Sequence, residues 1–514
     1  MGVVIFVMFK NHSLFCCVNK TERELFIMFK PKIEEIENLS KEYKYVPVST
    51  EIFSDTTPIQ VLKILKKCDE HCFLLESVEK SEKVGRYSFL GFEPSMEITC
   101  SNGVLKIKTK DKTEIIKTVS PQEHIKQILE NYKTPKFDFM PSFTGGLAGY
   151  FSYDFIKYYE PQLNINAKDD ENFKDVDLML FDKIIAFDNI RQKIILIVNI
   201  KTDNIKENYQ KGIQELERLK DLIQNGKPYE IKKGRLKSDF KSLFNKEQFC
   251  SMVERAKHYI KEGDIFQVVL SNRFEADYEG DLLNTYRMLR TINPSPYMFY
   301  FGSNDLEIAG ASPETLVKLE NGSLYTFPLA GTRKRGKTRE EDLMLEKDLL
   351  SDEKELAEHN MFVDLGRNDV GRIAKFGSVE VEKYMTIERF SHVMHIGSTV
   401  RGELREDKSQ LDTIGSILPA GTLSGAPKIR ACEIINELEN NKRGIYGGAI
   451  GYLDFNGNLD TCIAIRIAYK KNNKVFVRVG AGIVYDSIPE NEYTECINKS
   501  QAVINALKTS QEVL

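Results

Sequence analysis

The sequence predicts a mixed α+β protein with antiparallel sheets, and three observations support this fold class. Amphipathic helical patterns are mixed with short apolar runs, without the strict strand–helix–strand order of a parallel sheet. Tight turns such as Asn456-Gly457 are typical of β-hairpins. Of the 514 residues, 41% are hydrophobic and 29% charged, which is the balance of a globular chain that can bury a substantial core.

Charge and cysteine content exclude several classes of protein. The chain has 72 basic and 76 acidic residues, so no overall field favours nucleic acid or an anionic membrane. Nine cysteines without a C-x-x-C pair fit neither a disulfide framework nor a zinc ribbon. They predict reduced thiols in a cytoplasmic protein. The apolar run over 2–9 is too short to cross a bilayer.

Composition shifts divide the chain into three parts. Residues 1–30 form an N-terminal extension, and Met28 is an alternative start. Residues 31–245 and 246–514 are expected to form an N-terminal and a C-terminal domain. The Lys- and Gly-rich stretch 226–245 connects them.

The first half mixes helices and short strands. The apolar stripe over 58–67 predicts a helix, and alternation over 84–109 predicts a β-meander. Residues 184–198 indicate paired strands, and 208–225 an amphipathic helix.

In the second half, helix caps and turns define the elements. Asn245 is expected to cap a helix with Gln248, and a strand over 265–274 follows. The Asn-Gly turn predicts a hairpin between strands over 449–455 and 459–469.

One predicted helix carries a carboxylate within its apolar stripe. Ser351 is expected to cap this helix, and Met361, Phe362 and Leu365 form the stripe around Glu358. A carboxylate that faces a core is costly unless it is paired or bound to a cation. The pattern leaves an internal salt bridge and a cation site equally open.

A second acidic helix begins at Pro489 and carries Glu492, Glu495 and Lys499 on one face. An exposed Glu–Lys pair explains this face adequately by itself. Together with the helix of Glu358, however, it also fits a Mg²⁺ site, which needs only one or two protein carboxylates.

The second strand of the hairpin and the strand after it supply candidate anion-binding groups. Alternation places Arg466 between Ala464 and Ala468, where a guanidinium has room to grip a carboxylate. An exposed arginine on an edge strand is the alternative. Backbone N–H groups of Gly480-Ala481-Gly482 could approach the same anion.

Two Gly-rich loops and a histidine complete the candidates. The loop over 419–428 lacks the Gly-Lys-Ser/Thr of a P-loop, which argues against an NTPase. A second loop over 328–333 also exposes backbone donors. His395 is either a general acid or base or a hydrogen-bonded core histidine.

Together these stretches resemble the chorismate-utilising enzyme family, in particular its members that aminate chorismate. The similarity covers nearly all of the chain beyond the first thirty or so residues. The matching blocks are 74–77, 85–88, 145–150, 328–336, 358–371, 390–398, 420–428, 444–451, 459–466 and 480–499.

The resemblance implies an α+β fold with stacked antiparallel sheets surrounded by helices and a smaller, interleaved regulatory lobe. It implies that Glu358 and Glu495 hold Mg²⁺, that Glu314 protonates the departing C4 hydroxyl, and that His395 acts in the later loss of pyruvate. Substrate-binding positions implied by the resemblance are Gly331, Thr332 (also counted with the catalytic residues), Tyr446, Arg466, Gly480, Ala481, Gly482 and Lys499.

The expected reaction adds ammonia at C2 of chorismate and then eliminates pyruvate to give anthranilate, the first committed step of tryptophan biosynthesis. Family members of the p-aminobenzoate branch usually carry a lysine where this chain has Ala330, and isochorismate and salicylate synthases carry one where it has Gln267. Neither residue can do that lysine's chemistry. The remaining alternatives are the p-aminobenzoate branch and an inactive tryptophan-sensing paralogue.

The resemblance also implies regulation and a partner. Ser77 with Pro296, Tyr297 and Met298 matches a pocket for feedback inhibition by L-tryptophan. The chain has no Gly-x-Cys-x-Gly nucleophile elbow, and Cys432 falls within a predicted helix. A separate glutaminase subunit is therefore expected to supply ammonia, in a heterodimer or heterotetramer.

Overall fold

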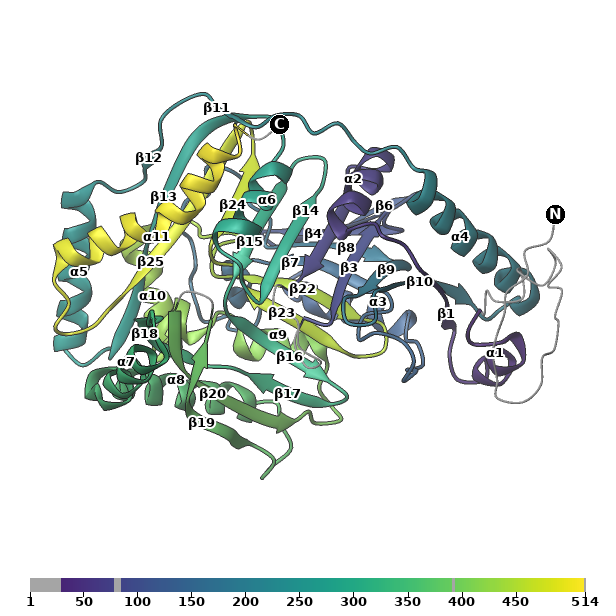
Figure 1. The fold of residues 1–514 in the computed structure, drawn as a ribbon. Helices are drawn as coiled ribbons and strands as arrows, with labels where there is room; N and C mark the ends of the chain where they lie inside the picture. The colour runs from purple at the N-terminus through teal and green to yellow at the C-terminus, as the bar shows by residue number, and fades with distance from the viewer. Residues whose placement is uncertain (1–28, 78–84, 391–392, 513–514) are drawn as a thin grey trace.

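Two antiparallel sheets form the framework of the computed structural model, which describes residues 29–77, 85–390 and 393–512 (Figure 1). The first sheet runs in the order β1 (Tyr45–Ile52), β10 (Lys193–Lys201), β9 (Lys183–Asp188), β3 (Tyr87–Phe92), β2 (Cys72–Glu76), β14 (Tyr297–Gly302), β15 (Glu307–Ser312), β24 (Ile467–Lys471), β25 (Lys474–Ile483), β13 (Gln267–Glu279) and β11 (Arg235–Leu236), and β12 (Lys241–Ser242) and β21 (Gly425–Ala426) also pair with β13.

The second sheet runs in the order β18 (Leu329–Lys334), β20 (Val393–Glu403), β17 (Ser323–Thr326), β16 (Thr315–Glu320), β23 (Leu459–Ile463), β22 (Ala449–Asp454), β7 (Gly146–Phe151), β8 (Val176–Phe181), β4 (Met96–Ser101), β5 (Val104–Thr109) and β6 (Thr113–Lys117). The remaining strand, β19 (Glu380–Arg389), pairs with β20.

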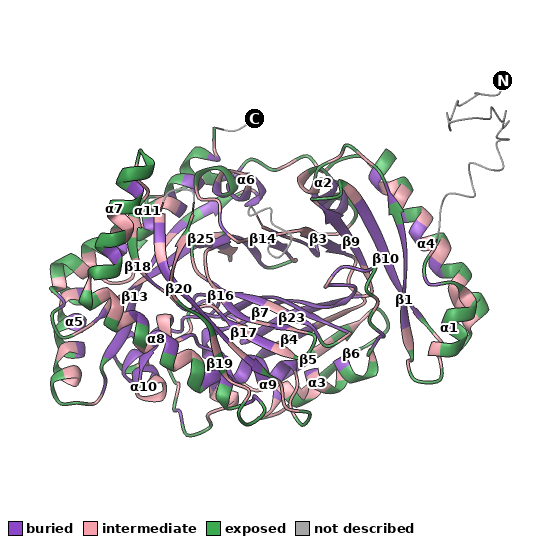
Figure 2. Ribbon diagram, turned by 60° about the horizontal axis from the view of Figure 1, so that its bottom comes forward, coloured by how far each residue is buried: buried purple, intermediate pink, exposed green. Residues whose placement is uncertain are grey.

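Helices cover the outer faces of both sheets, and their exposed sides face solvent (Figure 2). The α-helices are α1 (Ile33–Leu39), α2 (Pro58–Cys68), α3 (Pro121–Asn131), α4 (Ile205–Asn225), α5 (Lys246–Lys261), α6 (Leu283–Ile292), α7 (Arg339–Ser351), α8 (Glu353–Gly371), α9 (Gln410–Ile417), α10 (Lys428–Glu439) and α11 (Pro489–Thr509), with 3₁₀ turns η2 (Tyr153–Tyr158) and η3 (Gly421–Leu423). None of the described helices is long and apolar enough to cross a membrane.

Of the four hydrophobic clusters among the described residues, three hold the two sheets and their helices together. The cluster between the sheets is aromatic: Phe73 of β2 lies 4.8 Å, ring centre to ring centre, from Phe181 of β8. The other two clusters join each sheet to its own helices. Residues next to each other on one strand, such as Ile184 and Ile185, belong to different clusters. This follows from the two-residue period of a strand, whose faces are both buried here.

The predicted boundary at residue 245 does not separate the sheets. Each sheet contains strands from both sides of that residue; for example, β2 pairs with β14 in the first sheet and β7 pairs with β22 in the second. The two-domain division with interleaving stays a prediction, and most of the extension over 1–30 lies outside the described residues.

Several predicted elements are confirmed. Asn245 and Gln248 form a reciprocal capping box at the start of α5, and α2, α4, β9 and β10 occupy the predicted stretches. The seven cysteines within the described part of the chain are free.

Three local predictions are wrong. Ser351 does not cap α8, because it is the last residue of α7; the cap is Asp352, whose carboxylate accepts from two backbone N–H groups. Residues 84–109 do not form a meander: β3 belongs to the first sheet, and β4 pairs with β5 in the second. The strand over 459–469 is two strands in different sheets, with Arg466 in the connection between them.

Candidate active site

The candidate site lies where the chain passes from one sheet to the other. One such crossover joins β15 to β16 and carries Glu314, and another joins β23 to β24 and carries Arg466. The crossovers are hydrogen-bonded to each other: Ala311 N donates to Arg466 O (3.2 Å), and Ile463 N donates to Glu314 O (3.0 Å). Sheet pairing on both sides therefore fixes the relative position of Glu314 and Arg466.

Arg466 has the features of an anion-binding group, although strand alternation does not orient it. It adopts a left-handed backbone conformation (φ 52°), which takes it out of both ladders. Within the described residues its guanidinium forms no hydrogen bond or ion pair. Arg466 is exposed at the surface, and the protein atoms packed around its guanidinium lower its pKa by partial desolvation, while Glu314 opposes this. An anionic ligand would stabilise the charged guanidinium of Arg466.

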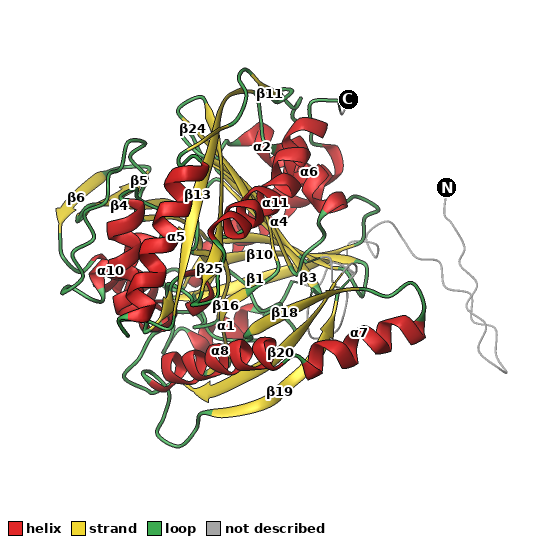
Figure 3. Cartoon of the chain, turned by 90° about the vertical axis from the view of Figure 1, so that its left-hand side faces the viewer, coloured by secondary structure: helices red, strands yellow, loops and turns green. Residues whose placement is uncertain are grey.

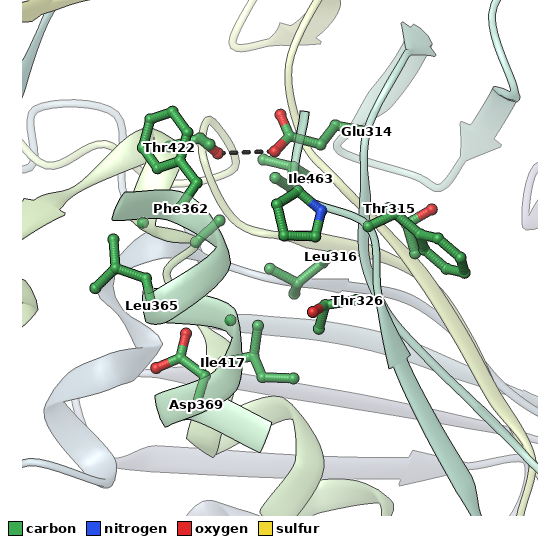
Figure 4. A pocket seen from close by; sticks show the side chains of 15 residues that line it. Glu314, Thr315, Leu316, Thr326, Phe362, Leu365, Asp369, Ile417, Thr422 and Ile463 are labelled. Atoms are coloured by element: carbon green, nitrogen blue, oxygen red, sulfur yellow. Dashed lines mark hydrogen bonds between the residues drawn. The ribbon is translucent and has the colours of Figure 1, made fainter. Parts of the chain in front are cut away.

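Glu314 has the features of a proton donor. Burial raises its pKa to about 7, against smaller opposing effects of Thr422 and Arg466. Its Oε1 accepts a hydrogen bond from the Thr422 hydroxyl at 3.0 Å (Figure 4). A cavity of about 50 Å³ borders Glu314 and Thr422 and extends past Thr326 to Asp369. A carboxyl group with this pKa is poised to give up a proton near neutral pH.

His395 lies on β20 and is held in one tautomer. Its Nδ1–H donates to the carbonyl oxygen of Gly331 on β18 (2.8 Å), and the Thr332 hydroxyl lies 3.1 Å from the same nitrogen. Burial lowers the pKa of His395, and Arg466 lowers it further. The ring is therefore neutral at pH 7, and Nε2 can accept a proton.

Helices α8 and α11 bring the predicted carboxylates to the same side of the site. Glu358 is half-buried, and its Oε1 lies 3.4 Å from Gln267 Nε2. Burial and the nearby Glu355 raise the pKa of Glu358, and Lys499 of α11 lowers it. Lys499 itself pairs with Glu495 at 2.6 Å, as the helical spacing predicts. The two helices thus face each other across these side chains.

These carboxylates fit a divalent cation. No Lys or Arg among the described residues forms an ion pair with Glu358. Burial, and then the charge of Glu495, raise the pKa of Glu492, so a cation would relieve repulsion on both helices. The described residues contain no group of three or more His, Cys, Asp or Glu arranged to hold a metal. Mg²⁺ does not need one, because it takes one or two carboxylates together with substrate and water.

Strand β25 supplies the glycines and connects them to both helices. Lys499 Nζ donates to Gly480 O (3.1 Å). A Cβ at Gly480 would lie 2.8 Å from the Tyr446 hydroxyl, and one at Gly482 would lie 2.7 Å from Gln267 Nε2. At Gly480 a Cβ would also lie 2.9 Å from the backbone oxygen of Leu270, so a side chain is excluded there, whereas at Gly482 the flexible end of Gln267 would have to move. Ala481 points the other way, into the core beneath the helices.

The two halves of the site meet at Gly331. Its φ is 62°, and a Cβ there would lie 3.2 Å from Glu355 Oε2, one turn of α8 before Glu358. Figure 3 shows α7 and α8 lying along the β18–β20 region that carries Gly331, Thr332 and His395. The structure therefore brings all the predicted catalytic, metal and substrate residues into one region.

The four residues assigned to a tryptophan pocket form a separate group. Ser77 directly follows β2, and Pro296 directly precedes β14; the two strands pair with Met298 opposite Glu76. Tyr297 extends towards the active site: its hydroxyl donates to Asp460 Oδ1 (2.9 Å) and lies 2.9 Å from Thr315 Oγ1.

Sequence reasoning missed two features. Thr422 lies in the Gly-rich loop that we singled out, but nothing local indicated that its partner is Glu314. The buried cluster of Glu439, Arg443 and Arg478 also gave no signal, because its members are 4 to 39 residues apart and belong to no recognisable motif.

Comparison with known proteins is consistent with this arrangement. The sequence model of the chorismate binding enzyme family matches residues 70–505. Anthranilate synthase component 1 of Acetivibrio thermocellus is 47% identical over 497 residues, covering 95% of this chain and 100% of the relative. The protein of the same name from Aquifex aeolicus is 46% identical, covering 93% and 98%.

Solved structures show the same family resemblance. Anthranilate synthase component I from Streptococcus pneumoniae superimposes with a TM-score of 0.72 and 40% identity, covering 83% of this chain and 93% of that one. The menaquinone-specific isochorismate synthase from Escherichia coli, at 18% identity and a TM-score of 0.66 over 92% and 98% of the two chains, shares the fold. The chain therefore belongs to the chorismate binding enzyme family and, within it, to the enzymes known as anthranilate synthase component 1.

Proposed function

We propose that this enzyme aminates chorismate at C2 with ammonia and then eliminates pyruvate to form anthranilate. The observation that carries the proposal is the pair of crossovers. They place Glu314, whose pKa is about 7, beside Arg466, a guanidinium without a partner among the described residues. The substrate is a dicarboxylate with a poor leaving group, and it needs both an anion anchor and a proton donor.

In the first half-reaction, ammonia forms a bond to C2, the two ring double bonds shift, and the C4 hydroxyl leaves. Protonated Glu314 gives its proton to this hydroxyl, which departs as water. Arg466 and Lys499 bind the substrate carboxylates, and the backbone around Gly480 and Gly482 leaves room for them. Glu358 and Glu495 would hold Mg²⁺, which when bound supplies charge neutralisation of a substrate carboxylate.

In the second half-reaction, the C2 proton is lost and the bond from C3 to the enolpyruvyl oxygen breaks with its electron pair, so that the ring becomes aromatic. The released enolate takes up a proton at its methylene carbon and becomes pyruvate. His395 is neutral and presents an unprotonated Nε2, which suits it to accept a proton in this step. Thr332 and Gly331 set the orientation of its ring.

We also propose that a separate glutaminase subunit delivers the ammonia and that L-tryptophan inhibits the enzyme. The names of the relatives, which designate a first component, support a partner. The contact of Tyr297 with Thr315, next to Glu314, supports communication between the Ser77 region and the acid.

One assay tests the proposal. The purified chain is incubated with chorismate, Mg²⁺ and an ammonium salt, and anthranilate fluorescence is followed. We expect a Mg²⁺-dependent rise that L-tryptophan suppresses, and no turnover when glutamine replaces ammonium in the absence of the partner. Conversion into a non-fluorescent amino compound would assign the chain to the p-aminobenzoate branch, and no consumption would contradict the proposed activity.

A further inference from the structure

Thr422 contacts the proposed acid directly. Its hydroxyl donates to Glu314 Oε1 at 3.0 Å, and Figure 4 shows the two side chains meeting at one end of the cavity. Among the described residues it is the one donor to this carboxyl group; the bond between Glu314 N and Ser312 involves the backbone of Glu314. The second oxygen, Oε2, has no protein donor in the described structure.

A protonated carboxyl group has one carbonyl-type oxygen and one hydroxyl oxygen. A donor that occupies Oε1 favours the carbonyl form there, so the acidic proton resides on Oε2. We propose that Thr422 is a positioning residue that assigns the transferable proton of Glu314 to Oε2, the oxygen that is left free for the substrate. The inference rests on the proposed role of Glu314 as the acid.

The backbone around Thr422 is fixed independently of Glu314. Thr422 lies in the η3 turn, and Arg443 Nη1 donates to the carbonyl oxygen of Leu423 (2.6 Å). The Ser424 hydroxyl donates to Ala420 O (2.8 Å). These bonds fix the backbone of the turn, so the Thr422 hydroxyl reaches Glu314 from a rigid support.

Few charged groups compete with this hydrogen bond. Arg466 on the neighbouring crossover favours the ionised form of Glu314, as does Thr422. Asp369 at the far end of the cavity is neutralised by Lys428 at 2.7 Å. His395 is neutral. Thr422 is therefore the main hydrogen-bonding influence on the acid, and loss of its hydroxyl would raise the pKa of Glu314.

The test compares Thr422→Val, which keeps the shape but removes the hydroxyl, with Thr422→Ser, which keeps the hydroxyl. The matched control is Thr326→Val: its hydroxyl lies in the same cavity but has no partner in the described structure. Profiles of kcat and kcat/KM against pH are measured with free ammonia held constant.

We expect Thr422→Val to lower kcat about tenfold and to move the basic limb of the profile up by about one pH unit. The KM for chorismate should stay unchanged. Thr422→Ser should restore both the rate and the profile, and Thr326→Val should match the parent enzyme. If Thr422→Val does not fold, Thr422→Ala removes the same hydroxyl with less bulk and is read in the same way.

A double variant separates this inference from the role of Glu314 itself. In a Glu314→Gln background, Thr422→Val should cause no further loss, because the residue acts through the acid. A full additional loss, an unmoved basic limb or a changed KM alone would overturn the inference. Glu314→Gln is therefore assayed before any Thr422 variant is made. If it retains full activity, Glu314 is not the acid.

Discussion

The buried cluster beneath the active site offers a quantitative test of what holds the site together. Glu439 accepts hydrogen bonds from Arg443 (2.6 and 3.0 Å) and Arg478 (2.7 Å), and also from the backbone and hydroxyl of Ser271. Arg443 also donates hydrogen bonds to the carbonyl oxygens of Leu423 and Val269. One carboxylate thus secures the η3 turn that carries Thr422 and the strand β13.

Replacing Glu439 with Gln keeps the shape but removes the charge. Both guanidiniums are at most 1% exposed, so neither can regain water without unfolding. Removal of one partner from a buried ion pair typically costs about 3–5 kcal/mol, and here one carboxylate serves two cations. We therefore expect Glu439→Gln to lower the free energy of unfolding by at least that amount.

The assay is urea denaturation followed by far-ultraviolet circular dichroism, since the chain has no tryptophan to report by fluorescence. The matched control is Glu437→Gln on the same helix. Glu437 pairs with Arg255 on the surface, where an ion pair contributes about 0–1 kcal/mol. If both variants shift the midpoint equally, burial of the cluster does not stabilise the fold as argued.

Three further predictions concern the chemistry. Glu358→Gln should abolish Mg²⁺-dependent turnover without moving the unfolding midpoint, because an amide is a weak ligand for Mg²⁺; retained turnover would refute the ligand assignment. Burial raises the pKa of Glu314 to about 7, and the protonated form is the active one, so kcat/KM for chorismate at constant free ammonia should fall as pH rises through about 7; a flat profile would exclude Glu314 as the acid. Ser77→Phe should relieve inhibition by L-tryptophan while leaving uninhibited turnover intact, because it adds bulk directly after Glu76, which pairs with Met298 next to Tyr297; an unchanged inhibition curve would place the inhibitor elsewhere.

Local patterns predicted the helices that carry the carboxylates. The spacing of Glu495 and Lys499 determines that they meet on α11, and the ion pair at 2.6 Å confirms it. The apolar stripe around Glu358 likewise indicated a carboxylate in an unusual position, and the structure shows it half-buried and without an ion-pair partner among the described residues. Such features depend on the helical period alone, so a sequence suffices to find them.

The wrong strand predictions share one physical cause: strands pair with partners that are far away in the sequence. Alternation over 459–469 is equally compatible with one long strand and with two strands in different sheets. The choice depends on partners far away: Ala464 exchanges backbone hydrogen bonds with 447–448 at the end of the β22–β23 ladder, and β24 then pairs with β15 in the other sheet. The same limit explains β3 and β4, whose partners β9 and β8 lie about 80 to 100 residues later in the chain. No local pattern encodes those choices.

That the chain changes sheets at Arg466 is also what makes this position suited to chemistry. Inside a ladder, a side chain points into one of two packed layers, and here both layers are apolar core. At a crossover the backbone leaves the ladder, and the left-handed conformation of Arg466 frees its guanidinium from both layers. Glu314 lies on the neighbouring crossover, and Ile463 N donates to its carbonyl oxygen at 3.0 Å, so the acid and the anion anchor share one rigid support. Sheet pairing on both sides therefore sets the relative position of Glu314 and Arg466, and no residue of the aromatic core between the sheets belongs to the site.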